Sequence, residues 1–420
     1  MKKKLVFVAM SPMRPLRDRT GQVGRRISRG LVFVGMSGGV DSSVAALLLK
    51  KQGYDVVGIF MRCYNVDGCA EQDAEDARRV AEHIGIPFYT WDFEKEYKKR
   101  VVEYMVKGYR AGLTPNPDVE CNREIKFGLF FKKALTMGAE YVATGHYVRR
   151  RATSVKGQKT FKLLQAKDKN KDQSYFLWTL TQDQLRHCLF PIGEYIKPEV
   201  RVIARRARLP TAEKKDSQGI CFLGKVTLAD FLKQYIKEEP GTILTTDGRV
   251  IGKHRGAYFY TIGQRHGLDL SGKHRALGIK GRGETKPHYV VGKDITTNTV
   301  VVAEGSDNLA LFQKKVSLNG IRFISKKSAM PKKISVMARV RYRQPLSQAI
   351  LLLDSREKGV LVFKQPQKFV APGQSAVFYK PRRGFSSNKA STFDKSTVDK
   401  SEDMEMLGGG VIMVGALTRF

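Results

Sequence analysis

Between Leu31 and Gly145, short apolar runs alternate with stretches of helical composition. The apolar runs, which are the predicted strands, are Leu31–Met36, Asp55–Met61, Pro87–Phe93 and Tyr141–Gly145. The predicted helices are Ser42–Gln52, Glu71–Ile84, Glu94–Gly112 and, after a loop at Leu113–Glu120, Asn122–Met137. Strands that alternate with helices build βαβ units, and the resulting parallel sheet carries its ligand site at the carboxyl ends of the strands. The sequence therefore predicts an α/β domain with a doubly wound parallel sheet over residues 31–212.

After residue 212 the pattern changes to short strands separated by polar or glycine-containing turns. The predicted strands are Tyr289–Gly292, Thr299–Val302, Val336–Arg341, Ala349–Leu353, Val360–Phe363 and Leu407–Met413, and Leu244–Val250 is predicted to contain a turn at Thr246–Gly248. This pattern predicts a small β-rich central domain over residues 213–285 and a C-terminal β-barrel over residues 286–420. Residues 380–405 are rich in Ser, Lys and Asp and have no apolar period, so we predict a flexible insertion there.

The chain carries a large positive charge, with 75 Lys and Arg against 40 Asp and Glu, a net charge of +35. Such a surplus repels itself unless a polyanion is near, which favours nucleic acid as the partner over an anionic membrane surface. A solvated basic surface is the alternative. No apolar run reaches the roughly 18–20 residues that cross a bilayer, so we expect no membrane partner. Residues 1–30 form a basic extension. It is a basic tail, a transit peptide or an artefact of the start codon that was chosen for the sequence.

The chain has five cysteines, which are Cys63, Cys69, Cys121, Cys188 and Cys221. They are too few and too irregularly spaced for a disulfide scaffold. Since no Cys-x-x-Cys pair is present and the seven histidines are scattered, we expect no structural metal site. The small number and irregular spacing of the cysteines fit a reducing compartment, and we expect the protein in the cytoplasm. Cys188 is predicted to lie in the core, and neither Cys63 nor Cys69 is assigned a catalytic role.

The strongest local motif is Ser37-Gly-Gly-Val-Asp-Ser-Ser43, which lies between the first predicted strand and the first predicted helix. Glycines at 38 and 39 let backbone N–H groups approach an anion without interference from a Cβ atom. The serine hydroxyls and the helix N-terminus add donors and positive potential. This combination predicts a phosphate cradle, in which Asp41 either holds Mg²⁺ or shapes the loop. The motif is not a Walker A sequence, so transfer of a γ-phosphate is not implied.

This heptapeptide resembles the PP-loop of the N-type ATP pyrophosphatases, which cleave ATP between its α- and β-phosphates and adenylate a substrate. Further segments match one family within that group. They are Gly58–Met61, Asn116–Asn122 with Ile125–Phe127, Ala143–Tyr147, Lys171–Leu177 and Asp216–Phe222. In this order they resemble the tRNA-specific 2-thiouridylases of the MnmA/TrmU type, over about Leu31 to Ile412. Residues 1–30 and 380–405 have no counterpart in the family pattern, which leaves localisation and surface contacts open.

The chemistry of 2-thiolation agrees with these residues. The C2 oxygen of uridine is a poor leaving group until AMP is attached to it, after which a sulfur nucleophile can displace it. Cys121 is predicted to lie in a loop just before a helix, where the N-terminal dipole favours the thiolate. The resemblance implies that Cys221 carries the incoming persulfide sulfur and that Cys121 helps to release it, which leaves a transient Cys121–Cys221 disulfide. It also implies that Asp118 is the general acid or base beside the target base.

The resemblance also implies two sets of binding residues. Those expected to bind ATP are Gly35, Met36, Ser37, Gly38, Gly39, Val40, Asp41, Ser42, Met61 and Gly145. Those expected to bind tRNA are Asn116, Pro117, Asp118, His146, Lys171, Asp172, Gln173, Arg341, Tyr342 and Gln374. Neighbouring Arg and Tyr side chains suit RNA, because one neutralises phosphate and the other stacks on an unpaired base.

The cofactors expected from the resemblance are ATP and Mg²⁺. The expected partners are the lysine, glutamate and glutamine tRNAs, modified at the wobble uridine, and a cysteine desulfurase or sulfur-relay carrier protein. We expect a monomer. Three alternatives stay open at this point. They are another PP-loop adenylating enzyme acting on a different substrate, an iron–sulfur thiolase acting on a different tRNA position, and a non-catalytic RNA-binding protein.

Overall fold

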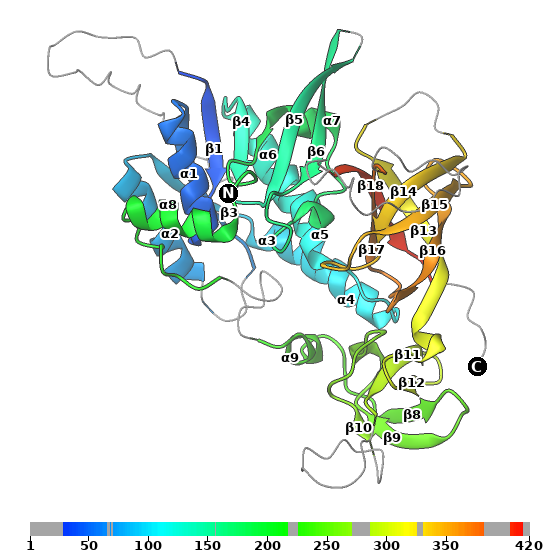
Figure 1. Cartoon of the computed structure of the whole chain (residues 1–420). Coiled ribbons are helices and arrows are strands. Elements are labelled where there is room, and N and C mark those ends of the chain that lie inside the picture. Colours follow the sequence, from blue (N-terminus) through cyan, green and yellow to red (C-terminus); the bar gives the residue numbers. More distant parts are fainter. Residues whose placement is uncertain are drawn as a thin grey trace, which may run out of the picture.

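The computed structural model describes most of the chain in three parts (Figure 1). The described residues are 28–64, 68, 70–155, 157–216, 226–270, 286–325, 331–381 and 404–414. Cys69, Cys221 and nearly all of the predicted extension 1–30 and insertion 380–405 lie outside the described residues. Within the described ranges, no helix combines the length and the apolarity that crossing a bilayer requires.

The N-terminal domain contains a parallel sheet of strand order β3-β2-β1-β4-β7, which confirms the predicted α/β fold class. Its strands are β1 (Leu31–Gly35), β2 (Asp55–Arg62), β3 (Phe88–Asp92), β4 (Tyr141–Thr144) and β7 (Cys188–Leu189). The central strand β1 is buried on both faces. Val32 and Val34 pack with helices α1 (Val40–Lys51), α2 (Ala70–Ile84) and α8 (Lys197–Arg206), whereas Phe33 faces the opposite core. This two-sided burial explains why β1 is apolar at every position.

The opposite face is covered by two helical segments, each of which contains π-helical turns. The first runs through α3 (Glu94–Tyr97), η1 (Lys98–Val102) and α4 (Glu103–Arg110), close to the single helix predicted at 94–112. The second runs through α5 (Pro117–Cys121), η2 (Asn122–Phe130) and α6 (Phe131–Thr136). It begins five residues earlier than predicted, since Pro117 occupies the first turn and the Asn116 side chain accepts a hydrogen bond from Val119 N at 3.2 Å. The expectation that Cys121 lies in a loop before the helix is therefore wrong.

The hairpin of β5 (Val148–Val155) and β6 (Gln158–Gln165) was not predicted from the sequence. It leaves the first domain, and β6 pairs with β18 of the C-terminal sheet. The chain then returns through η3 (Ser174–Phe176) and α7 (Gln182–His187) to β7 and α8. The first and third domains are thus joined through a shared sheet (Figure 1).

The central domain follows α9 (Leu228–Lys233) and has the strand order β10-β9-β8-β12-β11. Its strands are β8 (Gly241–Thr245), β9 (Val250–His254), β10 (Asp269–Leu270), β11 (His288–Asp294) and β12 (Thr299–Glu304), with η4 (Ala257–Phe259) between β9 and β10. We expected β11 and β12 in the C-terminal barrel, after a boundary at residue 285. They belong to the central sheet instead, because β12 pairs in parallel with β8.

The C-terminal domain follows η6 (Leu309–Leu311) and is a six-stranded antiparallel barrel. Its strands are β13 (Phe312–Phe323), β14 (Lys333–Arg339), β15 (Ser347–Leu353), β16 (Gly359–Lys368), β17 (Ser375–Tyr379) and β18 (Glu405–Ile412). The order β13-β16-β15-β14-β17-β18 is closed by the pairing of β13 with β18. The predicted C-terminal β-barrel is therefore confirmed.

Candidate active site

The loop between β1 and α1 lies where the chain order of the sheet reverses, with β2 on one side of β1 and β4 on the other. This switch point is the usual ligand site of an open parallel sheet. Gly38 has φ +70°, and a Cβ atom there would lie 2.3 Å from the carbonyl oxygen of Asp73. A Cβ atom on Gly145, just after β4, would lie 2.6 Å from the backbone nitrogen of Ser42. Both glycines are therefore required by the packing of the cradle.

The serine hydroxyls mainly hold the cradle in shape. Ser42 Oγ accepts from Ser37 N at 3.1 Å, and Ser43 Oγ donates to Gly39 O at 2.8 Å. Ser43 is fully buried and also accepts from Thr211 Oγ1 at 3.0 Å, so its hydroxyl faces the segment after α8 and not the opening. Ser37 is exposed at the mouth of the loop.

The other residues predicted for ATP fall into two groups. Met36 and Val40 are buried in the core, so only their backbone borders the cradle. Met61 is half-buried at the end of β2, and a Cβ atom on Gly35 would lie 3.0 Å from its terminal methyl group. The structure thus places the Met61 side chain over Gly35, beside the cradle.

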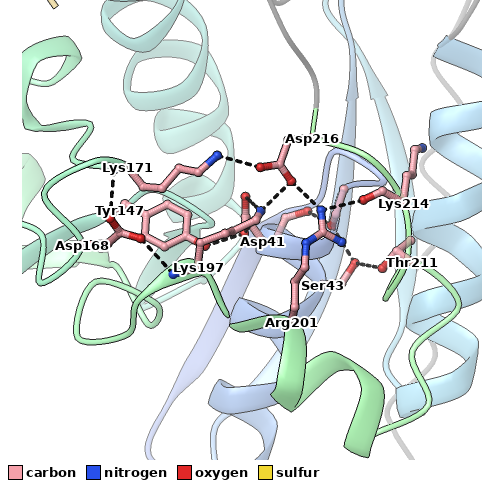
Figure 2. A network of polar contacts seen from close by, with 12 residues as sticks. Asp41, Ser43, Tyr147, Asp168, Lys171, Lys197, Arg201, Thr211, Lys214 and Asp216 are labelled. Atoms are coloured by element: carbon pink, nitrogen blue, oxygen red, sulfur yellow. Dashed lines mark hydrogen bonds and ion pairs between the residues drawn. The ribbon is translucent and has the colours of Figure 1, made fainter. Parts of the chain in front are cut away.

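A network of ion pairs adjoins the cradle (Figure 2). Lys197 Nζ lies 2.8 Å from both carboxylate oxygens of Asp41 and 2.8 Å from Asp216 Oδ1. Lys171 Nζ and an Arg201 guanidinium nitrogen also contact Asp216, at 2.7 and 2.8 Å. Partial burial alone would raise the pKa of Asp216, but the ammonium groups of Lys171 and Lys197 outweigh it and lower the pKa to about 2. Sequence reasoning did not single out Lys197, and Arg201 stood out only as the start of the basic run Arg201–Arg208.

Asp41 was predicted either to hold Mg²⁺ or to shape the loop. Both of its carboxylate oxygens are bound by Lys197, and Oδ1 also accepts from the Tyr147 hydroxyl at 2.8 Å. A metal ion on Asp41 would have to displace that ammonium, so the residues present do not fit a metal ligand at this position. No cluster of three or more His, Cys, Asp or Glu side chains suited to a metal occurs among the described residues.

The short helix α5 carries Asp118 and Cys121, which are three residues apart and therefore on one side of the helix. Asp118 is partly exposed and Cys121 is 3% exposed. The barrel holds the start of this helix. Gln374 Nε2 donates to Thr114 O at 2.9 Å, and Thr114 N donates to Pro372 O at 2.7 Å. The fold thus brings Gln374 to the Thr114–Pro115 backbone, directly before Asn116-Pro117-Asp118, from more than 250 residues away in the chain.

The three residues Lys171, Asp172 and Gln173, predicted to bind tRNA, point in different directions. Lys171 joins the ion network, and Gln173 Oε1 accepts from Tyr147 N at 2.9 Å. The Asp172 side chain is 1% exposed and accepts from Arg339 of β14 at 2.8 Å. The Asp172 carboxylate therefore links the first domain to the barrel.

Replacing Arg339 by methionine is expected to destabilise the protein by about 3–5 kcal/mol, because it leaves the Asp172 carboxylate buried without its cation. Arg343→Met, at an exposed position a few residues away, is the matched control and should change stability by less than about 0.5 kcal/mol. Chemical denaturation followed by circular dichroism measures the difference. Equal stability of the two variants would show that the pair does not hold the interface.

Of the two barrel residues in Arg341-Tyr342, only the tyrosine presents a ring for stacking. Arg341 is largely buried, where its Nε donates to Phe369 O at 2.7 Å and its guanidinium also contacts Ile262 O of the central domain. The Tyr342 ring lies 4.5 Å from Phe176, and the Arg343 guanidinium lies 5.3 Å above it. Tyr342 and Phe176 are both partly exposed and form an aromatic surface. The backbone oxygen of Phe176 accepts a hydrogen bond from Asn122 Nδ2, at the start of η2, at 3.3 Å.

His146 is buried between the rings of Phe127 and Phe190, with Nδ1 2.7 Å from Thr144 Oγ1. Burial, assisted by the charge of Lys126, holds the pKa of His146 well below its usual value near 6.5. The imidazole is therefore neutral at pH 7 and supplies no positive charge to an RNA.

We expect the ring of His146 to stay neutral at pH values near and below 6.5, where a solvated histidine takes up its proton. Because the unfolded chain binds this proton and the folded site resists it, His146 weakens stability as the pH falls below about 6.5. Imidazole ¹⁵N chemical shifts, assigned by comparison with His146→Gln, measure the charge. A midpoint near 6.5 for His146 would contradict the burial argument.

The predicted core position of Cys188 is confirmed. Cys188 is fully buried, and burial raises the pKa of its thiol, which disfavours the thiolate. Cys63 is half-buried against the core that contains α4 and η2. Cys221, the predicted persulfide carrier, lies outside the described residues, although Asp216 of the same motif is held by the ion network.

A parallel sheet with a glycine-dependent anion cradle at its switch point defines a nucleotide-binding α/β enzyme domain, here joined to two β domains. Family models match all three. Residues 30–225 match a tRNA methyl transferase HUP domain, residues 229–304 a tRNA methyl transferase PRC-barrel domain, and residues 313–384 an aminomethyltransferase beta-barrel domain.

The chain is 47% identical over 355 residues to the tRNA-specific 2-thiouridylase MnmA of Streptococcus sanguinis (strain SK36), which covers 83% of this chain and 91% of the relative. The same values hold for the enzyme of that name from Bacillus licheniformis. A solved 4-thiouridine synthetase with RNA and bound ATP has 17% identity, covers 49% of this chain and 50% of its own, and gives a TM-score of 0.30, which is too low to support an argument. The chain belongs to the tRNA-specific 2-thiouridylase (MnmA) family.

Proposed function

We propose that this protein is a tRNA uridine 2-sulfurtransferase, which uses ATP to replace the C2 oxygen of a wobble uridine by sulfur. The observation that carries the proposal is the pairing of two features in a chain of this family. One is the cradle that a Cβ atom at Gly38 or Gly145 would fill. The other is helix α5, which carries Asp118 and Cys121 and follows the Thr114–Pro115 backbone that Gln374 of the barrel binds.

In the first step the cradle binds the phosphates of ATP at the N-terminus of α1, where backbone N–H groups and the helix dipole favour an anion. The uridine C2 oxygen attacks the α-phosphorus, the bond to the β-phosphate oxygen breaks, and pyrophosphate leaves. Asp118, in the first turn of α5, moves the proton at the target base. Met61 would lie against the adenine, and a Mg²⁺ bound to ATP would be held by the phosphates, since Asp41 is occupied by Lys197.

In the second step the terminal sulfur of a Cys221 persulfide attacks C2, and AMP leaves with the original oxygen. The Cys121 thiolate then attacks Sγ of Cys221 and breaks the Cys221–sulfur bond, so the transferred sulfur stays on the uridine. The products are 2-thiouridine and a Cys121–Cys221 disulfide, which a dithiol reductant reopens with two electrons. A cysteine desulfurase or sulfur-relay carrier reloads Cys221.

The tRNA docks through its anticodon arm across the first domain and the barrel. Lys and Arg side chains, which give the chain its net charge of +35, neutralise the tRNA phosphates. Tyr342 and Phe176 stack on unpaired bases, and the Asn116-Pro117-Asp118 segment contacts the flipped uridine. The substrates are the lysine, glutamate and glutamine tRNAs, and the protein acts as a monomer in the cytoplasm.

The test is an in vitro reaction of the full chain with unmodified tRNA, ATP, Mg²⁺, a desulfurase and cysteine, followed by nucleoside analysis. We expect 2-thiouridine and one AMP for each thiouridine formed. If AMP is released in a tRNA-dependent way and sulfur appears at another position, the protein is a different PP-loop enzyme. If neither product forms although tRNA is bound, it is an RNA-binding protein, and the proposal fails.

A further inference from the structure

The cradle between β1 and α1 contains no cation of its own. Its residues Ser37–Ser43 include one charged side chain, the carboxylate of Asp41. A Walker A loop, in contrast, carries a lysine that reaches the phosphates. Pyrophosphate leaves ATP with several negative charges, and backbone N–H groups and a helix dipole neutralise them only in part. Positive side chains from other elements, together with the Mg²⁺ that accompanies ATP, would supply the remaining charge.

Three such side chains converge beside the cradle (Figure 2). Lys197 and Arg201 come from successive turns of α8, and Lys171 comes from the segment before η3. All three contact the carboxylate of Asp216, at 2.8, 2.8 and 2.7 Å. Two ammonium groups and a guanidinium around one oxyanion are the donors that proteins use to bind phosphate.

Lys197 connects this group of cations to the cradle. Its ammonium contacts Asp41 in the first turn of α1 as well as Asp216, and its side chain is only 10% exposed. The Tyr147 ring lies 5.9 Å from the ammonium, and the Tyr147 hydroxyl donates to Asp41. The carboxylate of Asp168 accepts the backbone N–H of Lys197 at 2.9 Å, which fixes the start of α8. The ammonium is therefore held in one place next to the phosphate loop.

We propose that Lys171, Lys197 and Arg201 form the binding site for the pyrophosphate end of ATP, and that Asp216 occupies this site until the nucleotide displaces it. Asp41 acts as the anchor that keeps Lys197 at the cradle. During adenylation the three cations neutralise the charge that develops on the leaving pyrophosphate oxygen. The inference rests on the proposed ATP-dependent function, which it extends by assigning the side chains that bind the leaving group.

The proposal predicts effects of opposite sign for two substitutions in this cluster. Lys197→Met should weaken binding of inorganic pyrophosphate and of ATP by roughly 10- to 100-fold, because one charge-assisted hydrogen bond is lost. Asp216→Asn should tighten pyrophosphate binding by roughly tenfold, because the competing carboxylate charge is removed. If Asp216 only held the cations in place, Asp216→Asn would weaken binding instead.

Titration calorimetry of the full-length variants with inorganic pyrophosphate, without tRNA, measures both effects. Lys167→Met is the matched control, since Lys167 pairs with Glu199 on α8, is half-exposed and does not contact Asp216. Lys171→Met, whose side chain is 34% exposed, provides a second test that disturbs the fold less and should also weaken binding. Melting temperatures of all variants identify any loss that comes from unfolding.

Weaker pyrophosphate binding in Lys197→Met together with tighter binding in Asp216→Asn would support the site. The same sign for both, or a loss in Lys167→Met equal to that in Lys197→Met, would overturn it. The proposed function is judged separately by 2-thiouridine formation in the wild type. If the wild type thiolates tRNA but neither variant changes pyrophosphate affinity, the binding site is wrong and the function stands. If the two variants change pyrophosphate affinity in opposite directions but the wild type forms no 2-thiouridine, the site stands and the function is wrong.

Discussion

Serine in place of Cys121 is expected to reduce 2-thiouridine formation by at least about 1,000-fold, and serine in place of Cys221 should do the same. Under the proposed mechanism, neither substitution touches the cradle, so the adenylation step and its tRNA-dependent release of pyrophosphate should persist in both. The two variants should differ in one respect. Cys121→Ser should accumulate sulfur on Cys221, because the thiolate that breaks the Cys221–sulfur bond is missing, whereas Cys221→Ser should accept no sulfur.

Radiolabelled sulfur from cysteine and a desulfurase, followed on non-reducing gels and in nucleosides, measures these outcomes. Cys63→Ser is the matched control, because Cys63 is half-buried in the same core and has no role in the mechanism. Cys121 is 3% exposed, so Cys121→Ala provides a second variant without a buried hydroxyl. Full thiolation in either Cys121 variant would rule out the two-cysteine mechanism.

Alanine at Gly38 is expected to lower kcat/KM for ATP by at least about 100-fold. Two penalties combine at this position. The residue has φ +70°, which costs an alanine about 1–2 kcal/mol, and the added Cβ atom would lie 2.3 Å from the backbone oxygen of Asp73. Since Asp73 belongs to α2 and its carbonyl cannot rotate away independently, the loop must move and the N–H groups of the cradle lose their alignment.

Gly138→Ala separates the two penalties. Gly138 has φ +89° and no atom within 4 Å of the position of a Cβ, so alanine there carries the conformational cost alone. We expect Gly138→Ala to lose about 1 kcal/mol of stability and to keep wild-type ATP kinetics. Steady-state AMP formation and denaturant titration of both variants measure the difference. Similar ATP kinetics in the two variants would show that the contact with Asp73 does not shape the cradle.

Several features were predictable because their causes are local. The apolar run at β1, the glycines at 38 and 39 and the strand–turn–helix order specify a parallel sheet with an anion cradle, whatever the rest of the chain does. The barrel strands were also recognised, because each has the alternation and bounding turns of an antiparallel strand. The helical segment that opens with α5 was predicted to begin at Asn122 and not at Pro117, since the capping role of Asn116 and Pro117 was not recognised.

Other features depended on contacts between distant segments. The hairpin β5–β6 was missed, and the domain boundary was placed before β11 and not after β12, because strand pairing partners are not encoded in the periodicity of a single strand. Asp172 was expected at the tRNA surface, and its side chain lies at the interface with Arg339, which is 167 residues away in the sequence.

By itself, the sequence determined the α/β class, the position of the cradle and the family, because these depend on local periodicity, on glycine positions and on motifs read in order. Only the tertiary structure decided that Lys197, 156 residues from Asp41, meets it at the cradle and shares Asp216 with Lys171 and Arg201. An isolated lysine in a basic sequence is most stable in water, and it becomes a buried partner of two carboxylates only when α8 packs against α1.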